Sequence, residues 1–551
     1  MSEAFHNQVA SARAAGQIYR RPLGIALPAT LVEALHANAA RMRALVVGGS
    51  VRDAVLGHAP KDIDVEVYGI NYEHLAAVLE RYGRMSLVGK QFGVIKFRDG
   101  ADGELDVSIP RRESKTGVAH TDFATSFEPD IHPREAAARR DFTVNALAWD
   151  PLTQEIHDYF GGVDDLAAGV LRATSPAFAE DALRVLRGMQ FSARFDLRLD
   201  QATAELCRAL RPEYAHLSRE RVAEEWMKLA VKGKRPGLLW SYLIETGWIE
   251  LYPPLARLVG VPQDPEWHPE GSVEAHVGHV LDAMARVADR EGVVADDRAV
   301  LVFAALTHDL AKSFVRDGGT TAQREKRGRM RWTAHGHEEA GGPMAREFLA
   351  SLGIKASIVE RVVPLVENHL QHIRAPSGGE MSVATVRQLA DRLAPATVRE
   401  LALLIEADQS GRPPLPGGLP RPARRMLNLA EQEGIAGGPP PRLIQGRDVL
   451  PYFGGAAGPH IGKAVAAAYD AFLKGVFSTH DEARSWLRNY LESEARLVRG
   501  SDVLVFVGTP GPHVGAILKS AWEAQLAGEF SDRAGAEQWL RRYVEQHGRA
   551  Q

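Results

Sequence analysis

Two carboxylates, Asp62 and Asp64, stand one residue apart within VVGGSVRDAVLGHAPKDIDVEVYG, residues 46–69. On a β-strand, side chains at positions i and i+2 point to the same face, so the two carboxylates would project side by side. Adjacent carboxylates repel each other unless a cation lies between them, and Mg²⁺ on a phosphate prefers oxygen ligands of this kind. The pair therefore predicts a site where Mg²⁺ and a phosphate meet.

The residues before this pair suit a triphosphate. Apolar runs predict buried strands over 44–47 and 63–67, with a short helix over 51–56 between them. Gly48 and Gly49 let the backbone turn tightly and approach a ligand closely. The free N–H groups of a helix start, together with Arg52, favour bound phosphate.

A third carboxylate, Asp106, lies on the return strand of a predicted hairpin. The stretch GVIKFRDGADGELDVSIPRRES has Gly-Ala-Asp-Gly at residues 100–103, where a turn is expected. The alternative is an exposed strand aspartate with no role in chemistry.

A predicted helix over 178–195, FAEDALRVLRGMQFSARF, carries an acid and two arginines. Asp181, Arg184 and Arg187 are spaced i, i+3 and i+6 and would share one face. Cytosine and adenine both present an amino donor beside a ring-nitrogen acceptor, whereas guanine and uracil present the reverse order. An acceptor–donor pair of Asp and Arg would therefore select C and A, and a mismatch would cost about 1–3 kcal/mol for each buried group left unpaired. The alternative is an exposed ion pair of little energetic value.

These motifs resemble the signature of class II nucleotidyltransferases, the family of CCA-adding tRNA nucleotidyltransferases and bacterial poly(A) polymerases. RRDFTVNALAWD, residues 139–150, resembles the second family motif, which implies Arg140 on the triphosphate and Asp141 on the ribose hydroxyls. Asp106 stands where the family places its third acidic residue, and ATSPAFAEDALRVLR and PRRESKTG look more like the CCA-adding branch. The resemblance implies catalytic Asp62, Asp64 and Asp106, and nucleotide contacts from Gly48, Gly49, Arg52, Arg140, Asp141, Asp181, Arg184 and Arg187.

A second set of metal-binding residue types lies in the middle of the chain. VLVFAALTHDLAKS, residues 300–313, ends an apolar helix in a His-Asp doublet, with EWHPEGSVEAHVGHVLDAM upstream and HGHEEAGGPMA, LVENHL and EADQSGR downstream. This order resembles the HD superfamily of metal-dependent phosphohydrolases. The resemblance implies a metal site of His276, His308, Asp309 and Asp408, with His337 and His369 as candidates for a second metal. Neutral imidazoles beside carboxylates suit Ni²⁺, Mn²⁺ or Fe²⁺, and Mg²⁺ is an alternative.

The C-terminal end repeats itself. Residues 458–492 and 511–545 are identical at 16 of 35 positions at an offset of 53, and each copy has a proline, Pro459 or Pro512, where a helix should start. Each copy resembles the tail module of other class II tRNA nucleotidyltransferases, which lies near the tRNA elbow. The alternative is a packing module that does not contact RNA.

Length and composition fix the outline. A chain of 551 residues exceeds one core, and its single cysteine, Cys207, excludes intramolecular disulfides. The net charge of −4, the lack of a signal peptide and the lack of an 18-residue apolar run predict a cytoplasmic protein with no membrane span. We expect an α+β fold: a mixed-sheet head over 25–165, a helical neck and body over 166–265, a helical HD domain over 266–415 and a helical tail over 440–551. The Pro/Gly-rich stretch 411–425 predicts a linker, and the oligomeric state is left open.

The predicted function is addition or repair of the 3′-terminal CCA of tRNA from CTP and ATP, with Mg²⁺ in the head. In some bacterial CCA-adding enzymes an HD domain follows the head, and there the resemblance implies 2′,3′-cyclic phosphodiesterase and phosphatase activity on RNA ends. Two alternatives remain open: a poly(A) polymerase or a partial enzyme that adds only CC or only A, and an HD nucleotide phosphohydrolase whose head only binds nucleotide.

Overall fold

The computed structural model describes residues 17–60, 62–89, 93–99, 104–115, 123–326, 328–373, 381–453, 458–493, 496–530 and 532–547. The chain forms two compact units. The first runs to His369 and includes Leu403–Leu419, and the second comprises Leu370–Ala402 and the chain from Pro420 onward. The domain boundaries expected from the sequence stay predictions, because this division does not separate head, neck and body.

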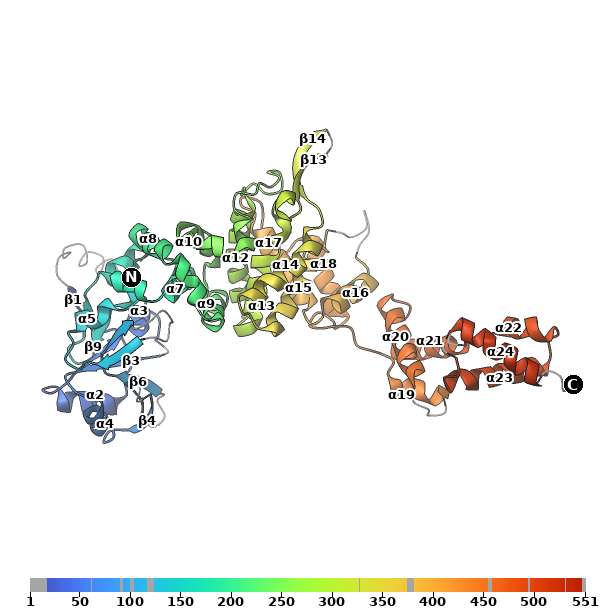
Figure 1. The fold of residues 1–551 in the computed structure, drawn as a ribbon, viewed down its shortest axis with the longest axis horizontal. Helices are drawn as coiled ribbons and strands as arrows, with labels where there is room; N and C mark the ends of the chain where they lie inside the picture. Colours follow the sequence, from blue (N-terminus) through green and yellow to red (C-terminus); the bar gives the residue numbers. More distant parts are fainter. Residues whose placement is uncertain are drawn as a thin grey trace. The chain divides into compact units, whose positions relative to one another are not determined.

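The head holds an eight-stranded sheet in the order β1-β10-β9-β2-β3-β6-β5-β4 (Figure 1). β3 and β6 run parallel, and the other neighbouring pairs are antiparallel. The strands are β1 (Gln17–Arg20), β2 (Arg43–Val47), β3 (Asp64–Tyr68), β4 (Arg84–Gly89), β5 (Val94–Arg98), β6 (Glu104–Ser108), β9 (Ala148–Asp150) and β10 (Glu155–Asp158). A mixed sheet followed by a mostly helical chain confirms the predicted α+β class.

The centre of the sheet follows from its apolar residues. Leu45, Val46, Val65 and Val67 are fully or almost fully buried, as the two apolar runs predict. Helix α3 (Gly49–Val55) starts directly after β2. The paired segment of β3 begins only at Asp64, opposite Val47. The prediction that Asp62 lies on this strand was therefore wrong, since Asp62 lies in the bend before it.

The predicted hairpin is present as β5 and β6, which pair from Val94↔Ser108 to Arg98↔Glu104. Its expected turn at 100–103 lies outside the described residues. β6 also pairs with β3 on its other side, in a register that places Asp106 opposite Asp64. The sheet itself thus brings the third carboxylate beside the second.

The helix expected over 178–195 begins later, as α7 (Leu183–Phe195). Ser175 accepts a hydrogen bond from the backbone N–H of Ala177 and starts a 3₁₀ turn over Pro176–Glu180. Asp181 ends that turn, so the prediction that it shares a helix face with Arg184 was wrong. The other helices of the head and of the segment that follows it are α2 (Ala29–Asn38), α4 (Tyr72–Leu79), α5 (Pro133–Ala138), α6 (Gly162–Ala168), α8 (Gln201–Ala209), α9 (Arg219–Lys232), α10 (Leu239–Glu245) and α11 (Pro253–Ala256).

The following part of the first unit is helical apart from one hairpin (Figure 1). The hairpin strands β13 (Thr321–Lys326) and β14 (Arg329–Ala334) lie in the chain between α13 and α14, and the sequence patterns did not predict them. The helices are α12 (Val273–Arg290), α13 (Ala295–Thr307), α14 (His337–Ser351), α15 (Ala356–Asn368) and α17 (Val398–Ser410). In the described part of the chain, none of the helices combines the length and the apolar character that crossing a membrane requires.

In the second unit the sequence repeat is a structural repeat. Each copy has three α-helices, and the second of them starts at the predicted proline, Pro459 or Pro512. The copies are α19 (Gly446–Val449), α20 (Pro459–Leu473) and α21 (His480–Ser493), then α22 (Gly500–Val507), α23 (Pro512–Leu526) and α24 (Arg533–His547). Their buried cores use equivalent positions, for example Phe477 and Phe530. The predicted linker was wrong at its end, because residues 421–425 begin α18 (Arg421–Gln432).

In each copy, one aromatic side chain of the long helix contacts a part of the chain that precedes that copy. Tyr469 of α20 donates a hydrogen bond to Asp391 of α16 (Val383–Leu393) at 2.7 Å. The equivalent position of α23 is Trp522, which packs on the core of the first copy with its ring 5.4 Å from Phe453. Two successive interfaces therefore use the same position of the repeat.

Arg387 of α16 anchors the first tail copy, and we expect its loss to be costly. Its side chain is 2% exposed and donates to Glu433 at 2.5 Å and to the carbonyls of Phe472 and Phe477 at 3.1 and 3.2 Å. Arg387→Met leaves the carboxylate and two carbonyls without their donor and should lower the free energy of unfolding by about 3–5 kcal/mol. Denaturant titration measures this.

The matched control is Arg399, which pairs with Glu431 at 2.8 Å on the surface of the same unit. Arg399→Met should cost about 1 kcal/mol or less, because exposed ion pairs contribute little. Equal losses in the free energy of unfolding for the two variants would contradict the prediction that the buried contacts of Arg387 stabilise the tail more than an exposed ion pair does.

Candidate active sites

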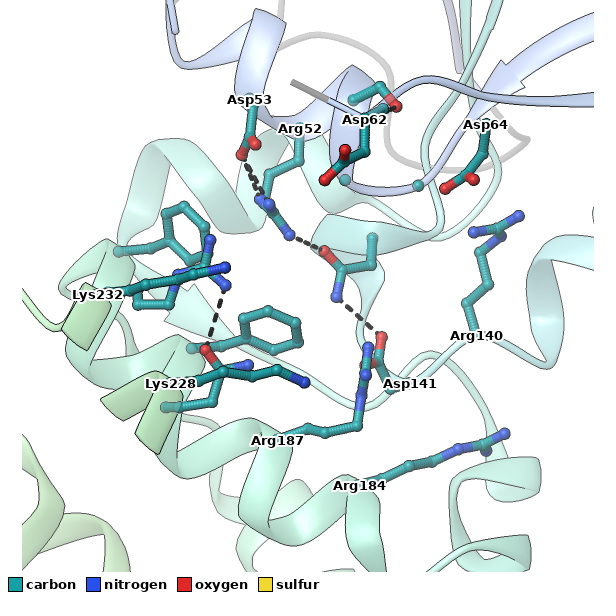
Figure 2. Close-up of a pocket in the computed structure, with 18 of the residues that line it drawn as sticks. Arg52, Asp53, Asp62, Asp64, Arg140, Asp141, Arg184, Arg187, Lys228 and Lys232 are labelled. Atoms are coloured by element: carbon teal, nitrogen blue, oxygen red, sulfur yellow. Dashed lines mark hydrogen bonds and ion pairs between the residues drawn. The ribbon is translucent and has the colours of Figure 1, made fainter. Parts of the chain in front are cut away.

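A polar cleft of about 910 Å³ lies between the head sheet and helices α7 and α9 (Figure 2). Its wall combines five carboxylates with an excess of cations. The carboxylates are Asp53, Asp62, Asp64, Asp141 and Asp181, and the cations are Arg52, Arg111, Arg139, Arg140, Arg184, Arg187, Arg194, Arg221, Lys228, Lys232 and Lys234. A large anion such as a nucleoside triphosphate fits this charge pattern.

The carboxylates predicted to hold a metal are close together. Asp64 starts β3, Asp62 lies two residues earlier, and both line the cleft, whereas Asp106 is the register partner of Asp64 on β6. Burial raises the pKa of Asp64, and the charges of Asp106, Glu66 and Asp62 raise it further against the effect of Arg140. Repulsion of this kind is relieved by a divalent cation, so the donor set fits Mg²⁺.

The backbone conformation at position 48 and the nearby side chain of Arg140 both favour a glycine there. Its φ of +76° is a conformation that favours glycine, and a Cβ atom there would lie 2.7 Å from Nη1 of Arg140. Arg140 in turn donates to Glu66 of β3 at 3.0 Å. The glycine thus leaves room for an arginine that reaches the cleft beside the carboxylates.

A chain of hydrogen bonds holds two more arginines (Figure 2). Arg52 donates to Asp53 at 2.7 Å and to Asn145 at 2.5 Å, and Asn145 donates to Asp141 at 2.9 Å. The other carboxylate oxygen of Asp141 accepts from Arg187 at 2.8 Å. Asp141 is buried and already accepts three hydrogen bonds, since the N–H of Phe142 also donates to it. In this structure it positions Arg187, and its expected contact with the ribose stays a prediction.

Asp181 and Arg184 both line the cleft but do not pair with each other. Asp181 pairs with Arg221 of α9 at 2.8 Å. Arg184 donates to the backbone carbonyls of Ala177 and Arg139 at 2.5 and 2.8 Å, which fixes its guanidinium. A base could therefore be offered an Asp acceptor and an Arg donor that are held separately.

Sequence patterns missed the cations of α9. Arg221, Lys228 and Lys232 follow a spacing of i, i+7 and i+11, which places them on one helix face, and all three line the cleft. That spacing was a signal available in the sequence. The pairing of Arg221 with Asp181 was not, because it joins residues 40 positions apart.

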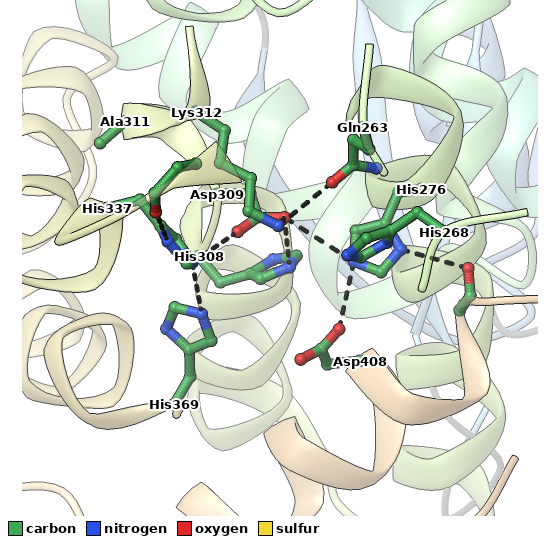
Figure 3. Close-up of polar contacts among 12 residues, drawn as sticks. Gln263, His268, His276, His308, Asp309, Ala311, Lys312, His337, His369 and Asp408 are labelled. Atoms are coloured by element: carbon green, nitrogen blue, oxygen red, sulfur yellow. Dashed lines mark hydrogen bonds and ion pairs between the residues drawn. The ribbon is translucent and has the colours of Figure 1, made fainter. Parts of the chain in front are cut away.

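A second candidate site lies in the HD region (Figure 3). Residues on α12, α14 and α17 and at the ends of α13 and α15 come together in a group of six that we call the His–Asp cluster. The six are His276, His308, Asp309, His337, His369 and Asp408. One group of three comprises His276, His308 and Asp408, and a second comprises Asp309, His337 and His369, with ligand atoms within 4.8 Å of one another in each.

Asp309, a member of the second group, also contacts the first. One of its carboxylate oxygens is 3.2 Å from Nε2 of His308, and the other is 3.3 Å from Nε2 of His337. His276 lies 3.1 Å from Asp408, and His337 lies 3.2 Å from His369. This arrangement suits a carboxylate shared by two metal ions.

The imidazoles are oriented for metal binding. In His308, His337 and His369, Nδ1 lies 2.6–2.9 Å from the carbonyl of the residue three positions earlier, so Nδ1–H donates and Nε2 faces the cluster. Nε2 of His308 and both carboxylate oxygens of Asp309 are buried without a well-directed hydrogen bond. Burial, with the neighbouring His337, lowers the pKa of His369 to about 3, so this ring is neutral at pH 7. Buried, unsatisfied donors of this kind fit divalent metal ions.

Glu270 is a cluster neighbour that the sequence patterns missed. Its carboxylate lies 2.8 Å from Nδ1 of both His268 and His276. A carboxylate on the far nitrogen of a ligand histidine orients the ring and raises its basicity. Burial lowers the pKa of His276, but Asp408 and Glu270 outweigh it and raise that pKa to about 9.

Known protein families match two segments of the chain, one in the head and one in the HD region. The profile of the poly A polymerase head domain matches residues 44–172, and that of the HD domain matches residues 273–398. Domains of these two kinds generally use divalent metals. The chain is similar to the multifunctional CCA protein of Xanthomonas campestris pv. campestris, with 34% identity over 382 residues that cover 67% of this chain and 86% of that protein.

A second relative is the multifunctional CCA protein of Nitrosococcus oceani, with 32% identity over 404 residues, 72% of this chain and 91% of that protein. Among solved structures, an apo form of a CCA-adding enzyme has a TM-score of 0.57 at 18% identity and covers 87% of this chain and 100% of its own. The Bacillus stearothermophilus CCA-adding enzyme in complex with CTP has a TM-score of 0.53 at 20% identity, and covers 85% and 99%. The structural likeness concerns the fold, whereas the sequence identity over most of the curated relatives' length shows that the chain belongs to the family of multifunctional CCA proteins.

Proposed function

We propose that this chain adds or repairs the 3′-terminal CCA of tRNA from CTP and ATP. The observation that carries the proposal is the pair Asp62 and Asp64 at the rim of a cleft lined with arginines and lysines. Family membership supports it, as do solved CCA-adding enzymes of the same fold whose names include CTP, ATP and tRNA.

In the proposed reaction, Asp62 and Asp64 would hold Mg²⁺, and Asp106, the register partner of Asp64, would complete the set of catalytic carboxylates. When bound, Mg²⁺ lowers the pKa of the primer 3′-hydroxyl and offsets the charge of the leaving pyrophosphate. Arg52, Arg140 and Arg187 hold the triphosphate, so that its α-phosphate lies toward the carboxylate rim. Lys228 and Lys232 extend this cationic wall along α9.

Asp181 and Arg184 are proposed to select the base. The protein then acts as the template, because an acceptor and a donor fixed in the cleft match the edges of C and A but not those of G and U. The hydrogen bonds that hold Arg184 to two carbonyls keep its remaining N–H groups in place for this role.

We expect Arg184→Ala to lower discrimination against UTP and GTP by about tenfold or more, since each mismatched buried group costs about 1–3 kcal/mol. Single-nucleotide incorporation with each of the four triphosphates measures this. Arg194→Ala is the matched control, because Arg194 lines the same cleft and should weaken all four triphosphates alike. If Arg184→Ala also weakens all four equally, Arg184 binds phosphate instead.

One experiment tests the function as a whole. A tRNA transcript that ends at the discriminator base is incubated with CTP, ATP and Mg²⁺, and its 3′ ends are sequenced. We expect CCA. Addition of CC alone, of A alone or of an A run would instead indicate a partial enzyme or a poly(A) polymerase.

We further propose that the HD region removes phosphate from RNA 3′ ends as a 2′,3′-cyclic phosphodiesterase and phosphatase. The His–Asp cluster is proposed to hold Ni²⁺, Mn²⁺ or a similar ion, because most of its donors are imidazoles. A divalent ion there supplies Lewis acidity and lowers the pKa of bound water for attack on phosphorus. The two activities are linked by chemistry, since an RNA end that carries 3′-phosphate has no free 3′-hydroxyl to extend.

A further inference from the structure

The hairpin β13–β14 carries four cations on one face. Residues directly opposite each other in an antiparallel pair share a face, and so do residues two positions apart on one strand. The register pairs Arg324 with Arg331 and Lys326 with Arg329, and all four therefore lie on the same side, which we call the cationic face.

This arrangement is unfavourable by itself, because like charges directly opposite each other destabilise a hairpin. Arg331 is partly neutralised by Glu266 at 2.5 Å, while Arg324 donates to the neutral hydroxyl of Thr333. Lys326 and Arg329 are exposed, and within the described residues the structure gives neither of them a carboxylate partner. A bound anion would relieve the repulsion between them.

The cationic face leads to the His–Asp cluster. Lys326 and Arg331 line a cavity of about 250 Å³ whose other walls include His268, His337 and Lys312. His337 belongs to the cluster, and Nζ of Lys312 lies 2.8 Å from Asp309 (Figure 3). An anion that follows the hairpin into this cavity thus arrives at the proposed metal ligands.

The cavity also offers an aromatic platform. Trp267 lines it and is 58% exposed, which is unusual for a side chain of this size. Exposed aromatic rings beside cations are the combination that binds single-stranded nucleic acid, because bases stack on the ring while cations contact the backbone.

We infer that the cationic face and Trp267 bind the 3′-terminal nucleotides of an RNA strand and guide its end phosphate to the His–Asp cluster. A β-strand rises about 3.4 Å per residue, so cations two residues apart on the hairpin lie about 7 Å apart. The cationic face can therefore contact more than one phosphate of an RNA backbone. A free mononucleotide would contact only the cavity, which includes Lys326, whereas a strand would also contact Arg329 beyond the cavity. The inference rests on the proposed phosphohydrolase function of the HD region.

The first test compares two substrates. The double variant Lys326→Ala/Arg329→Ala should lower kcat/KM for phosphate release from a 3′-phosphorylated oligoribonucleotide about tenfold relative to that for a nucleoside 2′,3′-cyclic monophosphate. Its dependence on salt should also weaken, with the slope of log(kcat/KM) against log[salt] reduced by about 1.4 for two lost phosphate contacts. Trp267→Ala should lower the same substrate ratio, and Trp267→Phe should restore it.

The matched control is Lys355→Ala/Arg361→Ala. It removes two cations that pair with Asp296 and Asp297 elsewhere in the HD region and line no part of this cavity. This control should leave the substrate ratio and the salt slope unchanged. An unchanged ratio for Lys326→Ala/Arg329→Ala, or an equal fall for the control, would overturn the inference.

A binding measurement separates this inference from the proposed function. The only native cysteine, Cys207, is buried, so Met330→Cys on the opposite face of the hairpin allows a single fluorescent label. The 3′-phosphorylated oligoribonucleotide should change the fluorescence saturably, and Lys326→Ala/Arg329→Ala should abolish that change. Saturable binding without hydrolysis in any metal would reject the phosphohydrolase proposal alone, and hydrolysis without a fluorescence response would reject the hairpin as the binding surface.

Discussion

Asp64→Ala should abolish nucleotide addition, with a loss of at least about 10³-fold in kcat. The side chain lies at the rim of the cleft between Asp62 and the register position of Asp106, where the proposed Mg²⁺ binds. Loss of a metal ligand removes several kcal/mol of transition-state stabilisation, and about 4 kcal/mol corresponds to 10³-fold. Incorporation of radiolabelled CTP into tRNA that lacks its 3′ end measures the effect.

Removing the charge of Asp64, by Asp64→Ala or by Asp64→Asn, should not impair folding. Burial and the neighbouring carboxylates raise the pKa of Asp64 above its usual value, so the folded state binds the proton more tightly than the unfolded state. Above the folded pKa the charged carboxylate therefore lowers the free energy of unfolding, and Asp64→Asn in a chelator should be at least as stable as the native protein. Asp130→Asn, at an exposed loop position outside the cleft, is the control for activity. Near-normal incorporation by Asp64→Ala would rule out the assignment of the metal site.

The second large effect concerns the His–Asp cluster. His308→Ala/Asp309→Ala should abolish phosphate release from tRNA that ends in a 2′,3′-cyclic phosphate, but should leave CCA addition to a free 3′-hydroxyl near the native rate. His308 belongs to one group of three and Asp309 to the other, whereas none of the cluster lines the cleft of the head. Phosphate release and CCA addition, measured on the same preparation, give the result.

Two further measurements guard this prediction. Loss of Asp309 leaves Lys312 without its carboxylate, so His369→Ala, which removes a neutral ring, should give the same loss of phosphate release without a new unpaired charge. Chelation followed by Mg²⁺ alone should restore CCA addition but not phosphate release. If the native protein releases no phosphate with Ni²⁺, Mn²⁺ or Fe²⁺, the proposed activity of the HD region is wrong.

Local pattern was enough for the parts of the head where neighbours along the chain determine the structure. The buried runs that form β2 and β3, the glycine turn at the start of α3 and the hairpin of β5 and β6 are all determined by residues close together in the chain. The prediction that Asp181 lies in the helix was wrong because apolar periodicity does not show where a separate capped turn precedes a helix. Ser175 and Pro176 start a separate turn there, and the helix begins after it.

Partners across the fold were the part that the sequence did not reveal. Asp181 meets Arg221 and Asp141 meets Arg187, in both cases through packing of separate segments. Each such contact depends on how helices pack, and residue spacing within one element carries no information on it. The hairpin β13–β14 was missed for a different reason, since its polar, alternating residues lack the apolar content by which a strand is recognised.

The repeated modules of the tail have a consequence for the order in which the chain unfolds. Tyr469 and Trp522 occupy one repeat position, and through it each copy contacts the element that precedes it, so neighbouring modules stabilise each other. Such a stack behaves as a one-dimensional array of nearest-neighbour couplings, in which the terminal member has one interface and the inner member two. Within the described residues, the second copy contacts one neighbour, the first copy, and should therefore fray first on heating, while the first copy, which Arg387 anchors, stays folded to a higher temperature.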